Sequence, residues 1–392
     1  MNVLFYRYGS ICEPDIIDTF TEFGFHVTQI DNEVTNKNLL PKDSLKIVSE
    51  QLLAHPADFV FSINFFPHLS EICNIFHIRY ICWSVDSPVF EFFAPSIKNP
   101  WNRIFLFDRA QYNEIHPLNP SCVFHLPLAA NVVSKEQLFA NTTLECKRKY
   151  QSEISFVGSL YTEKCSYDKL TGISPYTEGY LNGIMAAQEK IYGCYFIDEL
   201  LSDALVADFK AHLPNFYQPY PDSFLSDKNI LSLLYIGVKI SANERVNTMK
   251  LLGTHFPVDL YTGSDTSTLP MVRNCGLVKT LTEMPLVFSQ SKINLNITSK
   301  SIRTGLPLRI FDIISCGGFV LTNYQEELAD CFEIGADLET YGSMDELLYK
   351  AEYFLSHEKD RTEIAQNGLA TLKSRHTYLH RLEQIITTSF QF

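Results

Sequence analysis

The chain alternates between short apolar stretches and amphipathic stretches. Residues 2–8, 26–31 and 57–64 are apolar runs of strand length, and residues 43–53 carry leucine and valine at helical spacing. Turn residues such as Gly9 separate these segments. Strands that alternate with helices indicate crossover connections and a mainly parallel sheet.

The same alternation continues to the end of the chain, with two interruptions. Polar and charged residues at 132–153 are interpreted as a connection between domains, and residues 162–235 as a mostly helical insertion. The other predicted strands are residues 78–85, 103–107, 123–126, 153–161, 258–263, 276–280, 293–298 and 319–323.

The sequence therefore predicts an α/β fold of two doubly wound, Rossmann-like domains with parallel sheets. We expect residues 1–150 to form the first domain and residues 151–375 the second, with the insertion at about 162–235. Residues 376–392 are predicted as a C-terminal helix. Sheets of this kind bind ligands at the carboxyl ends of their strands, and two facing sheets would place the site in a central cleft.

Composition narrows the class of protein. The net charge of −13 argues against nonspecific nucleic-acid binding. Ten cysteines are scattered singly, which is typical of reduced thiols in a cytoplasmic protein. The first residues are predicted as a strand and not as a signal peptide, and no apolar run is long enough for a membrane span.

One stretch has the pattern of an anion site. An apolar strand ending at Thr298 is followed by a loop with hydroxyl, cationic and glycine residues, and Pro307 then opens a helix. A helix N-terminus offers free backbone N–H groups, and Arg303 and Arg309 add positive charge for phosphate oxygens. Asp312, one turn into the helix, is placed to accept hydrogen bonds from sugar hydroxyls. Together these features indicate a site for a nucleotide sugar.

Simpler readings of the same residues remain open. Arg309 and Asp312 are three apart on a helix and are also spaced for a surface ion pair. Arg245 has a similar alternative in its neighbour Glu244. A single glycine after a strand, as at Gly158, is most often a plain turn.

Several stretches together resemble a family. The chain resembles bacterial glycosyltransferases of the GT-B fold, and among them the CgeB-like group with its DUF3880-type N-terminal domain. The resemblance runs from about residue 80 to the C-terminus. It is carried by WSVDSP (83–88), FLFDRAQ (105–111), FHLPLAAN (124–131), ISFVGSLY (154–161), ISANERV (240–246), KINLNIT (292–298) and LPLRIFDIISCGGFVLTN (306–323).

The resemblance assigns roles in the last block. In retaining GT-B enzymes an acidic residue on this helix holds the ribose hydroxyls, and here that position is Asp312, where glutamate is commoner. Eight residues earlier, where the family often has a glutamate that contacts the donor sugar, this chain has Thr304. The amides of Gly305, Leu306 and Leu308 are expected to bind the diphosphate.

Further donor contacts are implied at other loops. Gly158 and Ser159 occupy the place of the glycine-containing loop after the first strand of the donor domain, and Arg245 is a phosphate-contact candidate. The base is expected near residues 264–281, where backbone groups would contact a pyrimidine edge. The donor is therefore expected to be a UDP-sugar.

The acceptor is expected on the first domain. Asp86 and Asp108 each follow an apolar strand, which makes them candidates for the general base that acts on an acceptor hydroxyl. Asp86 has an alternative role as a cap of the Ser87-Pro88 turn. A protein, peptide or surface glycan is the expected acceptor. For the insertion, acceptor binding and dimer formation are both open.

The sequence contains no Asp-x-Asp triplet of the kind that holds a donor diphosphate through a metal. We therefore expect no metal site and no cofactor, and transfer that is independent of metal. Retention of configuration is favoured by the resemblance, because the wider relatives retain. Two other interpretations are kept: a non-catalytic nucleotide-binding GT-B scaffold, and an epimerase that acts on the nucleotide sugar. The fold does not decide between them.

Overall fold

The computed structural model describes residues 1–37 and 39–391 of the chain, and it divides into two compact units. Unit 1 consists of residues 1–129, 219–225 and 376–392, and unit 2 of residues 130–218 and 226–375. The first unit thus ends earlier than the expected domain of residues 1–150. It also takes in a short segment of the insertion and the C-terminal helix.

Unit 1 is built on a six-stranded sheet in the order β2-β1-β3-β4-β5-β6, in which all neighbours are parallel. Strands β3 and β4 are almost wholly apolar and buried, as expected when helices cover both faces of a parallel sheet. The strands are β1 (Asn2–Tyr6), β2 (His26–Ile30), β3 (Phe59–Ile63), β4 (Arg79–Trp83), β5 (Asn102–Leu106) and β6 (Val123–His125).

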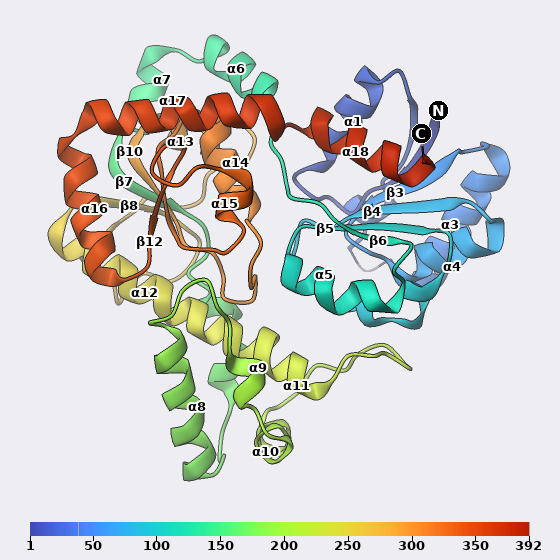
Figure 1. Cartoon of the computed structure of the whole chain (residues 1–392), viewed down its shortest axis with the longest axis horizontal. Coiled ribbons are helices and arrows are strands. Elements are labelled where there is room, and N and C mark those ends of the chain that lie inside the picture. The colour runs from blue at the N-terminus through green and yellow to red at the C-terminus, as the bar shows by residue number, and fades with distance from the viewer. Residues whose placement is uncertain (38, 392) are drawn as a thin grey trace. The chain divides into compact units, whose positions relative to one another are not determined.

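Helices flank this sheet, and the C-terminal helix α18 packs beside α1 (Figure 1). The helices of unit 1 are α1 (Glu13–Glu22), α2 (Asn32–Thr35), α3 (Pro41–Ala54), α4 (Pro67–Phe76), α5 (Arg109–Ile115) and α18 (Tyr378–Phe390). Three short 3-10 turns, at Phe90–Phe93, Pro95–Lys98 and His116–Leu118, complete the unit.

Unit 2 contains a second six-stranded sheet, in the order β12-β11-β10-β7-β8-β9, again with parallel neighbours. Two parallel sheets with flanking helices confirm the α/β fold predicted from the alternation of elements. The strands are β7 (Ser152–Val157), β8 (Val258–Tyr261), β9 (Arg273–Asn274), β10 (Ser291–Asn296), β11 (Val320–Asn323) and β12 (Glu339–Tyr341).

The core of unit 2 lies between its sheet and the long helices α12, α16 and α17. Apolar residues from β7, β8, β10 and β11 form it with residues from these helices. The helices outside the insertion are α6 (Val132–Asn141), α7 (Leu144–Arg148), α12 (Gly237–His255), α13 (Met284–Gln290), α14 (Leu308–Ser315), α15 (Leu328–Cys331), α16 (Met344–Ser356) and α17 (Glu358–Arg375).

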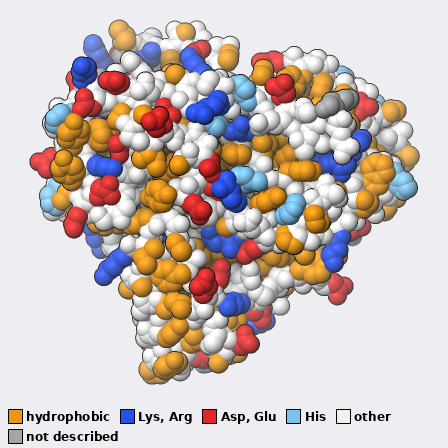
Figure 2. All heavy atoms as spheres, in the orientation of Figure 1, with side chains coloured by type: hydrophobic (Ala, Val, Ile, Leu, Met, Phe, Trp, Pro, Cys, Tyr) orange, Lys and Arg blue, Asp and Glu red, His pale blue; other side chains and the backbone are white. Residues whose placement is uncertain are grey.

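The insertion between β7 and α12 is largely helical, as predicted. Its helices are α8 (Pro175–Gln188), α9 (Ile197–Leu200), α10 (Asp203–His212) and α11 (Asp227–Asn229), with a π-helical turn η6 (Ile230–Ile236) that runs into α12. Short 3-10 turns lie at Thr162–Lys164 and Ser166–Lys169. Figure 2 shows hydrophobic side chains among charged ones over this insertion, and Tyr176 is 74% exposed.

The polar stretch at 132–153, predicted as a connection between domains, contains helices α6 and α7, which Asn131 and Thr143 cap with their side chains. One local prediction was wrong. Residues 276–280 form no strand. The edge of the sheet is instead the two-residue strand β9, which lies earlier in the sequence.

Glycines in two helices provide a test of the packing. A Cβ atom at Gly368 in α17 would overlap the carbonyl oxygen of Asp337, whereas nothing lies within 4 Å of a Cβ at Gly183 in α8. We expect Gly368→Ala to destabilise the protein by about 2 kcal/mol, because the clash exceeds the gain in helix propensity. Gly183→Ala should stabilise it by up to about 1 kcal/mol. Urea denaturation of both variants measures this, and equal effects would contradict the packing described.

Candidate functional site

The order of strands in unit 2 defines where a ligand is expected. Read from β9, the sheet runs to β8 and β7 and then continues with β10, β11 and β12, so the direction of winding reverses between β7 and β10. Loops that leave the carboxyl ends of two such strands diverge and form a crevice. The loop after β7 begins at Gly158, and the loop after β10 spans residues 297–307 and leads into α14.

The first part of the loop after β10 is fixed by buried polar contacts. Thr298 donates its N–H to the side-chain oxygen of Asn323 at 2.8 Å, and the amide of Asn323 returns a hydrogen bond to the carbonyl of Thr298 at 3.3 Å. The N–H of Lys300 donates to the hydroxyl of Ser241 on α12 at 2.9 Å. The loop is therefore tied both to the end of β11 and to α12.

The second part of the loop has its carbonyl groups occupied. Gln325 donates its side-chain amide to the carbonyls of Ile302 at 3.1 Å and Gly305 at 3.4 Å. The N–H of Glu327 donates to the carbonyl of Thr304 at 3.2 Å. The segment after β11 thus satisfies the acceptors of this loop and holds its backbone in one orientation.

Several backbone N–H groups of the same loop have no acceptor within the described residues. Within the described chain, the N–H groups of Gly305, Leu306 and Leu308 donate to no acceptor. Leu308 is the first residue of α14, where N–H groups have no partner inside the helix. These amides lie at the positive end of the α14 dipole, which favours an anion. The structure therefore gives the three predicted diphosphate contacts the geometry of an anion site.

Arg245 on α12 joins the loop after β7 to the loop after β10. Its guanidinium donates to the carbonyl of Ser159 at 2.6 Å and to the carbonyl of Ile297 at 2.7 Å. The ring of Tyr161 covers it at 4.0 Å. Arg245 was predicted as a phosphate contact. Its two bonds to backbone carbonyls show a positioning role in addition, since they fix the end of β10 against the loop after β7.

Arg309 brings a second guanidinium to the first turn of α14. Its side chain contacts the sulfur of Met284 and lies 5.4 Å from the ring of Phe288, both on α13. Burial lowers the pKa of Arg309. The charge of nearby Arg245 lowers it further, whereas Asp312 opposes the shift. Two positive groups, partly removed from water and balanced by one carboxylate, form an electrostatic environment that an anion stabilises.

Asp312 lies in the first turns of α14 and is half-buried beside Arg309. Its electrostatic contact with Arg309 agrees with the ion-pair alternative raised from their spacing. That contact leaves a sugar-binding role open, because a carboxylate accepts several hydrogen bonds.

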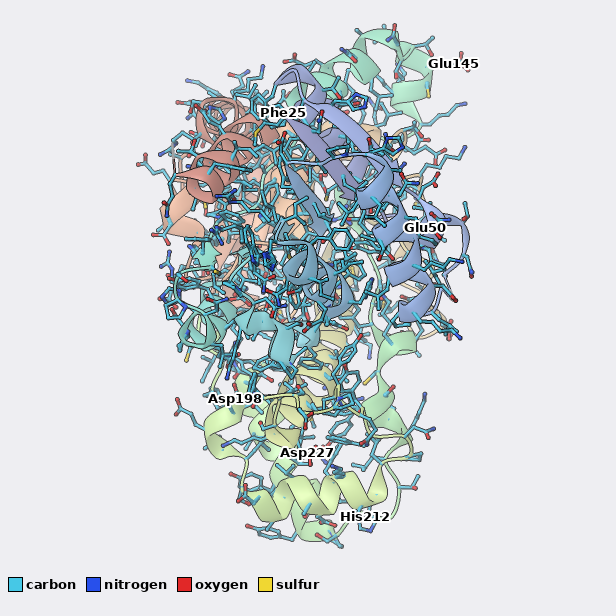
Figure 3. The ribbon with its side chains drawn as sticks, turned by 90° about the vertical axis from the view of Figure 1, so that its right-hand side faces the viewer. Phe25, Glu50, Glu145, Asp198, His212 and Asp227 are labelled. Atoms are coloured by element: carbon cyan, nitrogen blue, oxygen red, sulfur yellow. The ribbon has the colours of Figure 1, made fainter. Side chains whose placement is uncertain are left out.

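Arg303 lies on the other side of the loop. Its guanidinium is 3.7 Å from the carboxylate of Asp198, on α9 of the insertion, a residue labelled in Figure 3. This ion pair links Arg303 to the insertion. Thr304 is half-buried, and its carbonyl is held by Glu327.

The loop after β7 differs from its prediction. The N–H of Gly158 donates to the carbonyl of Tyr261 at 3.0 Å and so continues the pairing with β8. The hydroxyl of Ser159 donates to Glu163 at 2.6 Å. Both predicted donor-contact groups are therefore engaged in structure, and the loop contributes Tyr161 and the Arg245 contact to the site instead.

Asp108 in unit 1 is buried and has the contacts of a helix cap. One carboxylate oxygen accepts from the N–H of Ala110 at 3.2 Å, and the other accepts from the hydroxyl of Ser87 at 2.7 Å. These bonds begin α5 and fix the turn that follows Asp86. The geometry assigns Asp108 a structural role and leaves Asp86 as the carboxylate of the pair that faces solvent.

Asp86 is exposed and is held by Asn64. The side-chain amide of Asn64 donates to Asp86 at 2.7 Å and to the hydroxyl of Tyr8 at 2.9 Å. Its carbonyl oxygen accepts from the N–H of Val85 at 3.0 Å. Asn64 has a φ of 58°, a conformation that asparagine tolerates better than most residues. Sequence reasoning missed Asn64, although its place at the end of a buried strand was a usable signal.

Asp86, Asn64 and Tyr8 line a cavity of about 440 Å³ at the carboxyl ends of β1, β3 and β4. The sheet of unit 1 reverses its direction of winding between β1 and β3, so this cavity lies where a ligand is expected in such a sheet. Unit 1 thus has a candidate site of its own, distinct from the loop site of unit 2.

A directed chain of hydrogen bonds stiffens one wall of this cavity. Nε2 of His68 lies 3.0 Å from the hydroxyl of Ser44, which donates to Tyr6 at 2.9 Å. Tyr6 donates in turn to the carboxylate of Glu33 at 2.5 Å. Since Ser44 already donates to Tyr6, it accepts from His68, and His68 must carry its proton on Nε2.

Other polar side chains of unit 1 have structural roles. His125 contacts the carbonyl of Phe107 at 3.2 Å. Arg381 donates to the carbonyl of Pro127 at 2.8 Å and lies 2.5 Å from His376, and both side chains are buried.

No group of three or more histidine, cysteine, aspartate or glutamate side chains in residues 1–37 and 39–391 is arranged to hold a metal ion. Over the same residues, no helix combines the length and the apolar character needed to cross a membrane.

The ionisation of His68 tests the cavity wall. Burial lowers the pKa of His68 to about 4, so the folded protein keeps this ring neutral while the unfolded chain takes up a proton below pH 6.5. The stability that depends on the neutral ring is therefore present above pH 6.5 and is lost as the pH falls toward 4. Histidine-selective ¹⁵N NMR, assigned with His68→Asn, should show an Nε2–H tautomer at pH 5.5. A protonated ring at that pH would contradict this.

Comparison of the sequence with protein families gives one match. Residues 244–387 match a family model described as glycosyl transferase-like. This range contains Arg245, the loop after β10, α14 and Asp312. No protein among the curated sequences matches the chain significantly.

Comparison with solved structures covers the whole chain. Anabaena HepE in complex with UDP-glucose is similar over 100% of both chains, with a TM-score of 0.57 and 12% identity. Sucrose-phosphate synthase from Thermosynechococcus elongatus covers 100% of this chain and 99% of its own, with a TM-score of 0.57 and 8% identity. A Rickettsia africae glycosyltransferase covers 100% and 98%, with a TM-score of 0.52 and 9% identity. These similarities establish the fold of this chain as GT-B, the fold expected from its sequence.

Proposed function

We propose that the protein is a glycosyltransferase that moves a sugar from a UDP-sugar to an acceptor hydroxyl. The observation that carries this proposal is the start of α14, where three backbone N–H groups without a protein acceptor lie near two guanidinium groups and a carboxylate. Amides and guanidinium groups bind phosphate oxygens, and the carboxylate binds sugar hydroxyls. A nucleoside diphosphate sugar is the ligand that needs all three.

The comparisons support the same reading. The matching family model covers the residues that form this arrangement. HepE, which shares the fold, was crystallised with UDP, with UDP and glucose, and with UDP-glucose. We infer UDP as the nucleotide on this basis, with the base near residues 264–281.

The leaving diphosphate determines how the site would act. When the bond between the sugar and the diphosphate breaks, negative charge grows on the phosphate oxygens, and preorganised donors stabilise that charge without having to reorient. The amides of Gly305, Leu306 and Leu308 supply fixed dipoles, while Arg309 supplies a charge and Arg245 holds the two loops in place. We propose that this positive arrangement serves the transfer without a metal ion or another cofactor.

Asp312 is proposed to hold the ribose hydroxyls. It lies one turn beyond the amides, so the ribose and the diphosphate of one ligand fall on successive turns of α14. Retention of configuration is favoured by the resemblance to retaining enzymes. The position of Thr304, where those enzymes often have a glutamate, marks the donor sugar as the part of the substrate most open to variation.

We further place the protein in the CgeB-like group of bacterial glycosyltransferases, on the motifs from WSVDSP at 83–88 to the block at 306–323. The proposed acceptor is a hydroxyl on a protein, a peptide or a surface glycan. A cytoplasmic location is supported by the cysteines, since all ten are free thiols.

Thr304 also favours a second candidate function. A donor site that lacks the sugar-contacting glutamate would be retained in a scaffold that binds the nucleotide without transfer. The same site would serve an epimerase that changes the sugar while it is still attached to UDP. The three functions differ in their products.

The diphosphate site is tested by nucleotide binding. We expect Arg309→Gln to weaken UDP binding about ten- to a hundredfold, because a hydrogen bond to a charged group is lost. UMP, which lacks the second phosphate, should lose little affinity with this variant. Lys250→Gln removes one exposed positive charge from α12 and should leave UDP binding unchanged. Isothermal titration calorimetry of the unaltered protein and both variants with UDP and UMP measures these affinities, and titration with GDP and ADP compares the bases. Equal losses of affinity for UDP and UMP would contradict the assignment.

Product analysis separates the three functions. Incubation with UDP-glucose and related UDP-sugars, followed by chromatography, should release UDP by transfer or slow hydrolysis. Intact, tightly bound donor would instead indicate the scaffold, and an epimerised donor the epimerase. Asp312→Asn should lower the rate about tenfold, since weaker acceptors face the ribose. An unchanged rate in this variant would argue against the proposed role of α14.

A further inference from the structure

Aromatic side chains line part of the cavity of unit 1. Phe66 lines the cavity, and its ring lies 5.2 Å from that of Tyr6 and 5.5 Å from that of Tyr8, both edge-on. His68 completes this cluster at 5.6 Å from Phe66. Aromatic faces and edges in a cavity of about 440 Å³ offer apolar contact to one or two sugar rings.

The polar lining of the cavity is negative. Glu33, Asp86 and Glu91 contribute carboxylates, and no lysine or arginine of the described residues lines the cavity. Lys37 lies beside the lining, because its ammonium donates to the carbonyl of Tyr8 and is 6.0 Å from the Tyr8 ring, while Arg7 pairs with Glu13 at 3.1 Å. His68 is kept neutral by burial, as described above. The lining itself therefore carries three carboxylates and no cationic side chain, with the ammonium of Lys37 beside Tyr8 as a partial counter-charge.

Two of these carboxylates are held in place before any ligand binds. Asp86 accepts a hydrogen bond from Asn64 at 2.7 Å, and Glu33 accepts one from Tyr6 at 2.5 Å. Each keeps further acceptor positions, because an ionised carboxylate accepts about four hydrogen bonds. A carboxylate that is held in this way favours a ligand with hydrogen-bond donor groups, and most strongly a ligand with a positive charge.

A segment from later in the chain adds to the lining of the cavity. Residues 219–225 belong to unit 1, where the N–H of Phe224 donates to the carbonyl of Phe93 at 2.8 Å. Tyr220 on this segment lines the cavity, and its pKa is raised by burial and by the charges of Glu91 and Glu33. Its neutral hydroxyl adds a polar group to a lining that contains both of these carboxylates.

We propose that this cavity is the acceptor pocket and that the acceptor is an amino sugar with a free, protonated amine. The proposal rests on the proposed function, since it names the acceptor of that transfer. Sugar hydroxyls donate to the carboxylates, the apolar face of the ring packs on Phe66 and Tyr8, and the amine pairs with Glu91 or Glu33. Asp86, fixed by Asn64, faces the acceptor hydroxyl. Asn64 is a positioning residue in this arrangement.

Binding without UDP tests the pocket directly. Titration with methyl glucosaminide, followed by NMR or calorimetry, should give at least tenfold tighter binding than methyl N-acetylglucosaminide or methyl glucoside, which lack the charge. Glu91→Gln and Glu33→Gln should each remove most of this difference. Glu71→Gln, an exposed carboxylate on α4 outside the cavity, is the matched control and should remove none of it. Circular dichroism of each variant establishes that it is folded.

The source of the amine is tested in parallel. Lysine amide carries the same charge without a sugar ring, and we expect it to bind at least tenfold more weakly than methyl glucosaminide. Equal binding of charged and neutral sugars, or tighter binding of lysine amide, would overturn the proposal. Transfer from UDP-glucose to a neutral acceptor with no preference for the amine would overturn this inference while leaving the proposed function intact. Binding of the amino sugar without any turnover would leave the binding pocket supported and would overturn the proposed function.

Discussion

The candidate site of unit 2 depends on which backbone groups of one loop are hydrogen-bonded within the protein. Side chain and backbone after β11 bind the carbonyls of residues 302, 304 and 305, and the opposite edge of the same backbone is left with its donors. A peptide group has one donor and one acceptor on opposite sides, so fixing the acceptors fixes the direction of the donors as well. Gln325 is therefore as important to the anion site as any residue that would touch the anion.

Arg245 extends this constraint to the neighbouring loop. Its bonds to the carbonyls of Ser159 and Ile297 cross the point where the sheet changes direction, and they place a positive charge beneath Tyr161. The unpaired amides, Arg245 and Arg309 then all contribute positive electrostatic potential. Unit 1 has the opposite arrangement, because its cavity gathers three carboxylates. The two units thus differ in the sign of the charge that each presents to a ligand, as a donor diphosphate and a cationic acceptor would require.

Much of the fold followed from local patterns. Buried parallel strands are apolar and short, and the apolar positions of the helices between them recur every three to four residues, so the alternation predicted two parallel-sheet domains. The GT-B fold was implied by the resemblance of the sequence motifs. Local patterns were less informative in two segments. The polar stretch at 132–153 is helical because Asn131 and Thr143 cap its helices, and the two-residue strand β9 lies before the segment that looked like a strand.

The sequence by itself determined the chemistry at the start of α14, because a strand, a glycine-containing loop, a proline and a helix follow one another without gaps. The structure decided which side chains are available there, since that depends on contacts between residues far apart in the chain. Arg303 turns to Asp198 of the insertion, more than a hundred residues away, and Asp108 caps α5. The cavity of unit 1 was likewise beyond the sequence, because Tyr8, Asn64 and Tyr220 meet only where three distant segments converge.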